Sequence, residues 1–136
     1  MSWSASLIKL AAYEVEVCQG RLAEVAARRA EAEMRLAVLE AEGLAELARA
    51  EADPISGLYQ AAFMQALRAR KAEARARIAA LAAEEQGARD ALAQAFEAQK
   101  KYEHLAEQAR LRERQAEGRR ETAALDELAR RRKAAG

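Results

Sequence analysis

The side chains that could do chemistry are few and far apart in this sequence. It contains one histidine, His104, and one cysteine, Cys18. His104 lies near Glu103 and Glu107 on one side of a predicted helix, where a solvated helix face is the simpler interpretation. Cys18 falls among apolar residues at helical spacing, as a small residue packed between helices would, and a lone cysteine cannot form an internal disulfide. We therefore predict no catalytic residues, no metal site and no cofactor.

Motifs for phosphate, dinucleotide and zinc-protease chemistry are also missing. The sequence has no GxxxxGK[ST], GxGxxG or HExxH pattern. Its net charge of +1 creates no field that would attract nucleic acid. The basic run Arg130 to Lys133 lacks interleaved aromatic residues and suits the negative end of a helix dipole. We predict that the chain is not an enzyme and binds neither nucleic acid nor a small-molecule substrate.

The composition indicates long helices. Of the 136 residues, 38 are alanine and 33% are charged, whereas there are two Phe, three Tyr, one Trp and one Pro. Such a mixture with a helical repeat is typical of coiled coils. Strands favour β-branched and aromatic residues, which are scarce here. The fold class predicted is therefore all-α.

One strong interruption divides the helical pattern, the stretch ADPISG from Ala52 to Gly57. Pro54 removes a helical hydrogen bond and pushes the preceding Asp53 out of the helical region. Ser56 adds turn chemistry and a possible helix cap. We predict a helix over about residues 4–50, a turn over about 51–57 and a helix over about 58–133, all in one coiled-coil domain of residues 1–136.

Apolar residues then follow alternating steps of three and four, the spacing that keeps a seam facing a partner helix. Steps from residue 8 to 43 meet apolar residues at nine of eleven positions, with Arg29 and Gly43 as the exceptions. Steps from residue 64 to 109 do so at eleven of fourteen positions. The main predicted seam residues are Ile8, Val15, Leu22, Val25, Leu36, Leu39, Met64, Leu67, Ile78, Leu81, Leu92 and Tyr102.

If the chain folds back near residue 55, residue i faces roughly residue 111 − i. Ile8 then faces about residue 103, close to the point where the second seam fades. This agreement predicts an antiparallel two-helix coiled-coil hairpin with a C-terminal helical overhang. The overhang, from about residue 110 onward, is about 35 Å long and carries nine Lys or Arg against five Asp or Glu. It keeps helical propensity but lacks a seam, so we expect it to bind another protein.

The sequence shows no sign of export or membrane insertion. Its first residues, MSWSASLIKLAAYE, lack the basic and apolar regions of a signal peptide. No segment approaches the roughly 18 apolar residues of a membrane span. We predict a cytoplasmic protein.

Several short stretches resemble the FliJ family of flagellar export proteins. KKYEHL from Lys100 to Leu105, followed by RRETAALDELARRR from Arg119 to Arg132, resembles the family's C-terminal pattern. The segment from Tyr59 to Leu67, beginning YQAAF, resembles the stretch after the family's hairpin turn. The sequence departs from the family at Arg70 and Ala74, where a small apolar residue and a polar or aromatic one are expected.

The resemblance implies partners and sites. The family forms antiparallel coiled coils like the central stalk of rotary ATPases, binds the flagellar export ATPase and promotes its ring assembly, and contacts the cytoplasmic domain of the membrane export gate. The ATPase regulator and export chaperones are further implied partners. By this resemblance the ATPase contact comprises Arg120, Glu121, Leu125, Asp126 and Glu127, and the gate contact comprises Tyr59, Phe63 and Leu67. The implied location is the cytoplasm, with peripheral association at the inner face of the cell membrane at the flagellar base.

Three other functions fit the same pattern. One is a stalk protein of a virulence-type secretion system with the same fold. Another is a self-associating structural coiled coil, and a third is a chaperone that shields export substrates. Phe63 likewise has two interpretations, because it can close the hairpin tip or form part of an exposed apolar patch.

Overall fold

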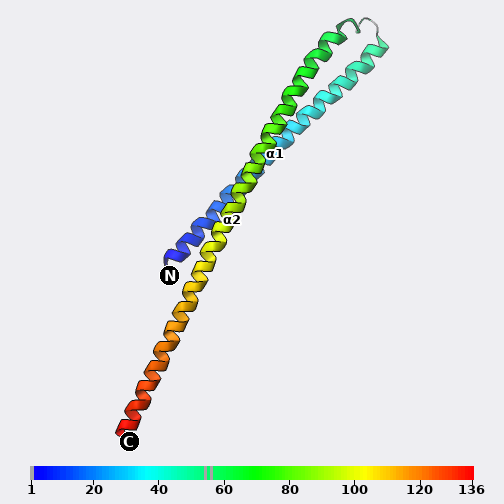
Figure 1. Cartoon of the computed structure of the whole chain (residues 1–136). Coiled ribbons are helices and arrows are strands. Elements are labelled where there is room, and N and C mark those ends of the chain that lie inside the picture. Colours follow the sequence, from blue (N-terminus) through cyan, green and yellow to red (C-terminus); the bar gives the residue numbers. More distant parts are fainter. Residues whose placement is uncertain (1, 54, 56) are drawn as a thin grey trace. The chain divides into compact units, whose positions relative to one another are not determined.

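Two long α-helices make up the structure. The computed structural model describes residues 2–53, 55 and 57–136. Helix α1 spans Ser2–Ala52 and helix α2 spans Gly57–Ala135. They pack against each other (Figure 1), which confirms the predicted all-α helical hairpin. Each helix end lies within two residues of its predicted position, because alanine-rich sequence continues a helix until turn chemistry interrupts it.

At the end of α1 the backbone N–H groups stop following the helical hydrogen-bond pattern. The Asp53 N–H still donates to the Arg49 carbonyl oxygen at 3.0 Å. The Ile55 N–H instead donates to the Asp53 side-chain oxygen Oδ1 at 3.0 Å. An aspartate that accepts from the backbone two residues ahead forms an Asx-turn, which offers the chain an alternative to continuing the helix. The roles predicted for Pro54 and Ser56 lie outside the described residues.

Contacts divide the chain into two compact units, and each unit combines a stretch of α1 with a stretch of α2. The hairpin unit is Glu16–Gln94, and the terminal unit is Met1–Val15 with Ala95–Gly136. The prediction of a single coiled-coil domain stays a prediction, and each unit is described by itself below.

The hairpin unit holds the most deeply buried side chains. Val25, Leu39, Leu67 and Leu81 are at most 2% exposed. Two cross-helix ion pairs fix the antiparallel register of this unit, Arg28 with Glu84 and Arg29 with Glu85. The residue numbers of these pairs add to 112 and 114, close to the predicted value of 111.

Large seam residues stand opposite small ones in this register. Gly43 makes room for Leu67, because a Cβ at Gly43 would lie only 2.8 Å from Leu67 Cδ2. By the same register Leu39 faces Ala74 and Leu81 faces Ala32. This alternation lets the two backbones approach closely while the larger side chains still fill the space between them.

The terminal unit has a thinner core. In it Ala11 and Val15 of α1 are buried, and Ile8 is half-buried. Ile8 lines a groove together with Glu103 and Ala106 of α2, as the predicted pairing requires. From residue 111 to 136 every residue is exposed, and α2 remains helical to Ala135. Figure 1 shows this orange-to-red part of α2 continuing beyond the blue beginning of α1.

All of the predicted seam residues are buried or half-buried. Val15, Val25, Leu39, Leu67 and Leu81 are buried. The other seven are half-buried, namely Ile8, Leu22, Leu36, Met64, Ile78, Leu92 and Tyr102. Half-burial of most large seam residues is expected for two helices, since no third element covers the sides of the interface.

The glycines give a direct test of the packing. Nothing lies within 4 Å of a Cβ built on Gly87, so Gly87→Ala should raise the free energy of unfolding by about 1 kcal/mol through helix propensity. Gly43→Ala should leave the free energy of unfolding unchanged or lower it. The added Cβ would collide with Leu67, which is 2% exposed and cannot move aside. Urea unfolding followed by circular dichroism measures both.

A second background separates the two effects. In a Leu67→Ala chain the obstructing methyl is absent, so Gly43→Ala should become stabilising there. Equal gains for Gly43→Ala and Gly87→Ala in the parent chain would show that Leu67 does not occupy the space at Gly43.

Candidate partner-binding surfaces

His104 and Cys18 are the two residues that the sequence singled out as most able to do chemistry. His104 is exposed on α2, and Cys18 is a half-buried free thiol on α1. Over the part of the chain that the structure describes, no group of three or more His, Cys, Asp or Glu residues could hold a metal ion. What the described residues offer are charged and apolar helix faces, which are surfaces for partners.

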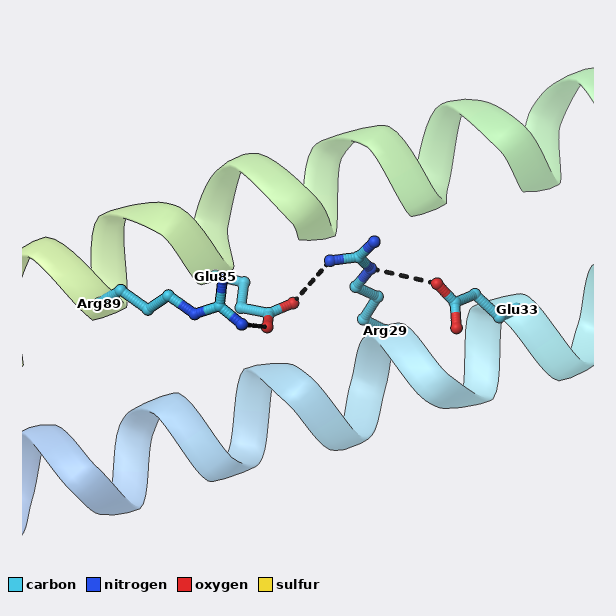
Figure 2. Close-up of polar contacts among 4 residues, drawn as sticks. All are labelled: Arg29, Glu33, Glu85 and Arg89. Carbon is cyan, nitrogen blue, oxygen red and sulfur yellow. Dashed lines mark hydrogen bonds and ion pairs between the residues drawn. The ribbon is translucent and has the colours of Figure 1, made fainter.

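One charged cluster lies inside the seam of the hairpin unit. The Glu85 side chain is 9% exposed, and both of its carboxylate oxygens accept hydrogen bonds. Oε2 accepts from Arg29 Nη1 across the interface at 3.0 Å, and Oε1 accepts from Arg89 Nη2 one turn along α2 at 2.8 Å. Arg29 Nε also donates to Glu33 Oε1 at 3.2 Å, as Figure 2 shows. Glu85 is therefore fully paired despite its burial.

The electrostatics of this cluster favour the charged form of Arg29. The hydrogen bond from Arg29 to Glu85 and the attraction between the two charges raise the pKa of Arg29, and Glu33 adds to the same effect. A raised pKa in a cation means that its stabilising charge is fully present below its ordinary pKa and is lost only as pH rises through the higher folded value. The Arg29 contribution is therefore constant across neutral pH.

Sequence reasoning counted these residues as defects of the seam. Arg29 interrupts the apolar row of the first helix, and Glu85 interrupts that of the second. The structure brings the two interruptions together, with a second pair, Arg28 and Glu84, joined at 2.9 Å beside them. The sequence did contain a signal for this pair, because Arg29 and Glu85 carry opposite charges and interrupt the two rows at nearly the same level. A register near 111 − i already places Arg29 close to residue 82.

The residues expected to meet an ATPase lie on the exposed part of α2. Arg120, Glu121, Leu125, Asp126 and Glu127 are all exposed. Leu125 is 66% exposed and lies in a shallow groove with Leu128, Ala129, Arg132 and Lys133. Glu127 lies 3.9 Å from Arg130 and 3.6 Å from Arg131, so its nearest charges come from its own helix. The segment thus presents a narrow apolar strip edged by cations.

The residues expected to meet an export gate differ in exposure. Tyr59 is 73% exposed, Phe63 is half-buried and Leu67 is 2% exposed. A partner approaching this conformation would therefore reach Tyr59 and part of Phe63, whereas Leu67 packs against Gly43 of α1. Phe63 was expected either to close the hairpin tip or to form part of an exposed patch. Its half-burial does not decide between these two roles.

Two surfaces were missed by sequence reasoning. On α1 of the terminal unit, Trp3, Leu10 and Tyr13 are 51–61% exposed. Their spacings of seven and three place them on one helix face, which was a readable signal. The other is an arginine-lined groove of the hairpin unit, which could be found only once the register of the two helices was known.

These features define the class of protein: an all-α helical hairpin with exposed charged and apolar helix faces. Over its described residues, neither helix contains a stretch long and apolar enough to cross a membrane.

Comparison with known proteins is consistent with that class. The family model described as "Flagellar FliJ protein" matches residues 5–135. Two proteins named "Flagellar FliJ protein", from Caulobacter vibrioides strains NA1000 / CB15N and ATCC 19089 / CIP 103742 / CB 15, are each 46% identical over 134 residues. These alignments cover 98% of this chain and 96% of each relative. No solved structure matches the chain.

The chain belongs to the flagellar FliJ family, which confirms the resemblance found in its sequence. It is thereby a flagellar export component. This membership favours the flagellar assignment over the virulence-type alternative.

The ion pair between the buried Glu85 and the partly exposed Arg29 can be tested by removing both charges. Replacing both Arg29 and Glu85 by Leu completes the apolar rows, and buried ion pairs are often less stabilising than well-packed apolar residues. We expect a higher melting temperature but less specific pairing, seen as dimers or larger assemblies in sedimentation, since interior charges can specify register. The single change Glu85→Leu should lower the melting temperature, because Arg29 loses its cross-helix partner and keeps only Glu33 of its own helix.

A matched control is the double change of Arg110 and Glu107 to Leu, which removes an exposed ion pair on α2. It should leave the melting temperature nearly unchanged. A seam double variant that stays strictly monomeric would refute a role of the Arg29–Glu85 pair in specifying the partner helix.

Proposed function

We propose that this chain works as a stalk-like subunit of the flagellar export apparatus. In this proposal the exposed part of α2 binds the export ATPase ring and promotes its assembly and activity. The hairpin unit contacts the cytoplasmic domain of the membrane export gate, and the chain also meets the ATPase regulator and export chaperones. Flagellum assembly and motility depend on it.

The observation that carries the proposal is the exposed helix from residue 111 to 136. A long helix without tertiary contacts is only marginally stable in water, since most helical stability in proteins comes from packing. Here Thr122 and Arg120 donate to carbonyl oxygens of their own helix, and the ion pairs of Glu127 also join residues of that helix. A helix that keeps its propensity yet buries nothing is suited to a surface supplied by another protein.

The chemistry of this segment suits a contact that forms and breaks. Ion pairs between exposed groups contribute about 0–1 kcal/mol each. The apolar strip at Leu125 and Leu128 is narrow, and both residues remain more than half exposed. Several weak contacts of this kind hold a helix inside a ring without locking it to one subunit. That property allows repeated engagement during ATP hydrolysis.

The second contact is assigned to the beginning of α2. Tyr59 and Phe63 offer an exposed ring and a half-exposed ring at helical spacing of four. Aromatic residues are enriched where proteins bind one another. Leu67 supports this face from beneath, through its packing against Gly43. We place the protein in the cytoplasm, peripherally associated with the inner face of the cell membrane at the flagellar base.

The proposal is tested by titrating the chain into the export ATPase of the same organism while ATP hydrolysis and ring assembly are followed together. The parent chain should stimulate both. Changing Leu125, Asp126 and Glu127 to Ala should abolish most of the stimulation, because the apolar strip and its acidic neighbours are removed while helix propensity is kept. Deleting residues 111–136 should have the same effect.

The matched control changes Leu111, Glu113 and Glu117 to Ala. It also removes one exposed leucine and two carboxylates from the same exposed segment. It should retain most of the stimulation. The deletion should leave the melting temperature of the remaining chain within about 2 °C of the parent, because every removed residue is exposed. Unchanged stimulation after the deletion would rule out the ATPase contact proposed for this segment.

A further inference from the structure

A groove lined by four arginines runs between the helices of the hairpin unit. Its volume is about 450 Å³, within the range of ligand sites. The lining residues are Arg28, Arg35, Arg70, Arg77, Glu31, Glu73, Ala32, Leu39 and Ala74. Leu39 is buried and Ala32 and Ala74 are half-buried, whereas all of the charged lining residues except the half-buried Arg28 are exposed. This groove is distinct from the surfaces assigned above.

The same eight-residue pattern supplies both sides of the groove. Residues 28–35 read RRAEAEMR, and residues 70–77 read RKAEARAR. Both have arginine at the first and last positions, a basic residue second, and Ala-Glu-Ala at the third to fifth. Because the helices are antiparallel, the two copies lie end to end along the helix pair, with Arg35 and Arg77 at their junction, and are related by local two-fold pseudo-symmetry. The lining residues are the equivalent Arg, Glu, Ala and Arg of each copy, joined by Leu39.

The register arranges the arginines at regular levels. With facing residues adding to 112–114, Arg35 and Arg77 stand at the same level. Arg28 lies seven residues away on one side, and Arg70 lies seven residues away on the other. Seven residues of helix span about 10.5 Å. The groove therefore presents cations at three levels along the helices, and successive levels are one heptad apart. A heptad is also the repeat with which one helix packs on another.

Three of these four arginines have no ion-pair partner among the described residues. Arg28 pairs with Glu84 at 2.9 Å. Arg35, Arg70 and Arg77 form no ion pair with any described residue, although Glu31 and Glu73 lie four residues before Arg35 and Arg77 in the same groove. Two like charges at one level destabilise a helix pair unless an anion lies between them. The groove has four cations against two anions and carries a net positive charge.

We propose that this groove binds a helical segment of a partner protein that carries carboxylates at heptad spacing. Its small residues would pack on Ala32, Leu39 and Ala74. Its carboxylates would meet Arg77 with Arg35 at the central level and Arg70 at the next, by bidentate contacts that suit arginine. The heptad spacing of the cations is what favours an acidic helix over a single compact anion. This proposal does not rest on the ATPase or gate contacts.

The test uses the full chain and a synthetic probe. The probe is a fluorescent helical peptide of about three heptads, with Glu at every seventh position, Ala and Leu on the same face and Gln elsewhere. Its control peptide has Gln in place of those Glu residues. Fluorescence anisotropy at low and physiological salt should show binding of the Glu peptide that weakens with salt, and about tenfold weaker binding of the Gln peptide.

The chain itself offers a matched pair of variants. Arg70→Gln with Arg77→Gln removes two groove arginines seven residues apart on α2. Arg68→Gln with Arg75→Gln removes two exposed arginines with the same spacing on the same helix, outside the groove. The groove variant should bind the Glu peptide about tenfold more weakly than the parent, and the control variant less than threefold more weakly. Circular dichroism establishes that both remain folded.

Charge reversal completes the test. A chain with Arg70→Glu and Arg77→Glu should lose the Glu peptide and bind a peptide with Lys at the heptad positions. Equal weakening by the groove and control variants would overturn the site in favour of diffuse positive charge. Equal binding of the Glu and Gln peptides would overturn charge recognition. Displacement of the Glu peptide by inorganic phosphate at an equal concentration would overturn a helical occupant in favour of a small anion.

Discussion

The close approach of two alanine-rich helices is the constraint on which the rest of the hairpin unit depends. Alanine buries little apolar area, so few side chains must supply most of the stabilisation. Leu39, Leu67 and Leu81 can do so because each stands opposite a small residue in the observed register. Gly43 is the extreme case, since even one added carbon would collide with Leu67. The sequence thus stabilises the pair by matching sizes across the seam, without large residues on both sides.

Charge enters the seam under the same constraint. Glu85 is 9% exposed, and a buried carboxylate without partners would be strongly unfavourable. Arg29 of α1 reaches one of its oxygens across the seam, and Arg89 of α2 occupies the other. Apolar positions alone tolerate neighbouring registers along such repetitive sequence. A charged pair at one level satisfies its hydrogen bonds in only one of them, which makes the antiparallel register specific.

Function then falls to the faces that the seam leaves open. The exposed end of α2, the beginning of α2 and the arginine-lined groove have different chemistry, namely a narrow apolar strip with cations, aromatic rings, and heptad-spaced guanidinium groups. Two helices provide several exposed faces at once, outside the seam that holds them together.

The sequence by itself determined the helices, their ends, the hairpin and the exposure of residues 111–136, because helical periodicity and turn chemistry act between residues a few positions apart. It also placed the register within about three residues of that observed. Only the tertiary structure decided that Arg29 meets Glu85, that Gly43 receives Leu67, and that the repeats at 28–35 and 70–77 share a groove. These contacts join residues 24 to 56 positions apart in the chain. A shift of one or two residues in register, which local pattern cannot resolve, would replace every one of them.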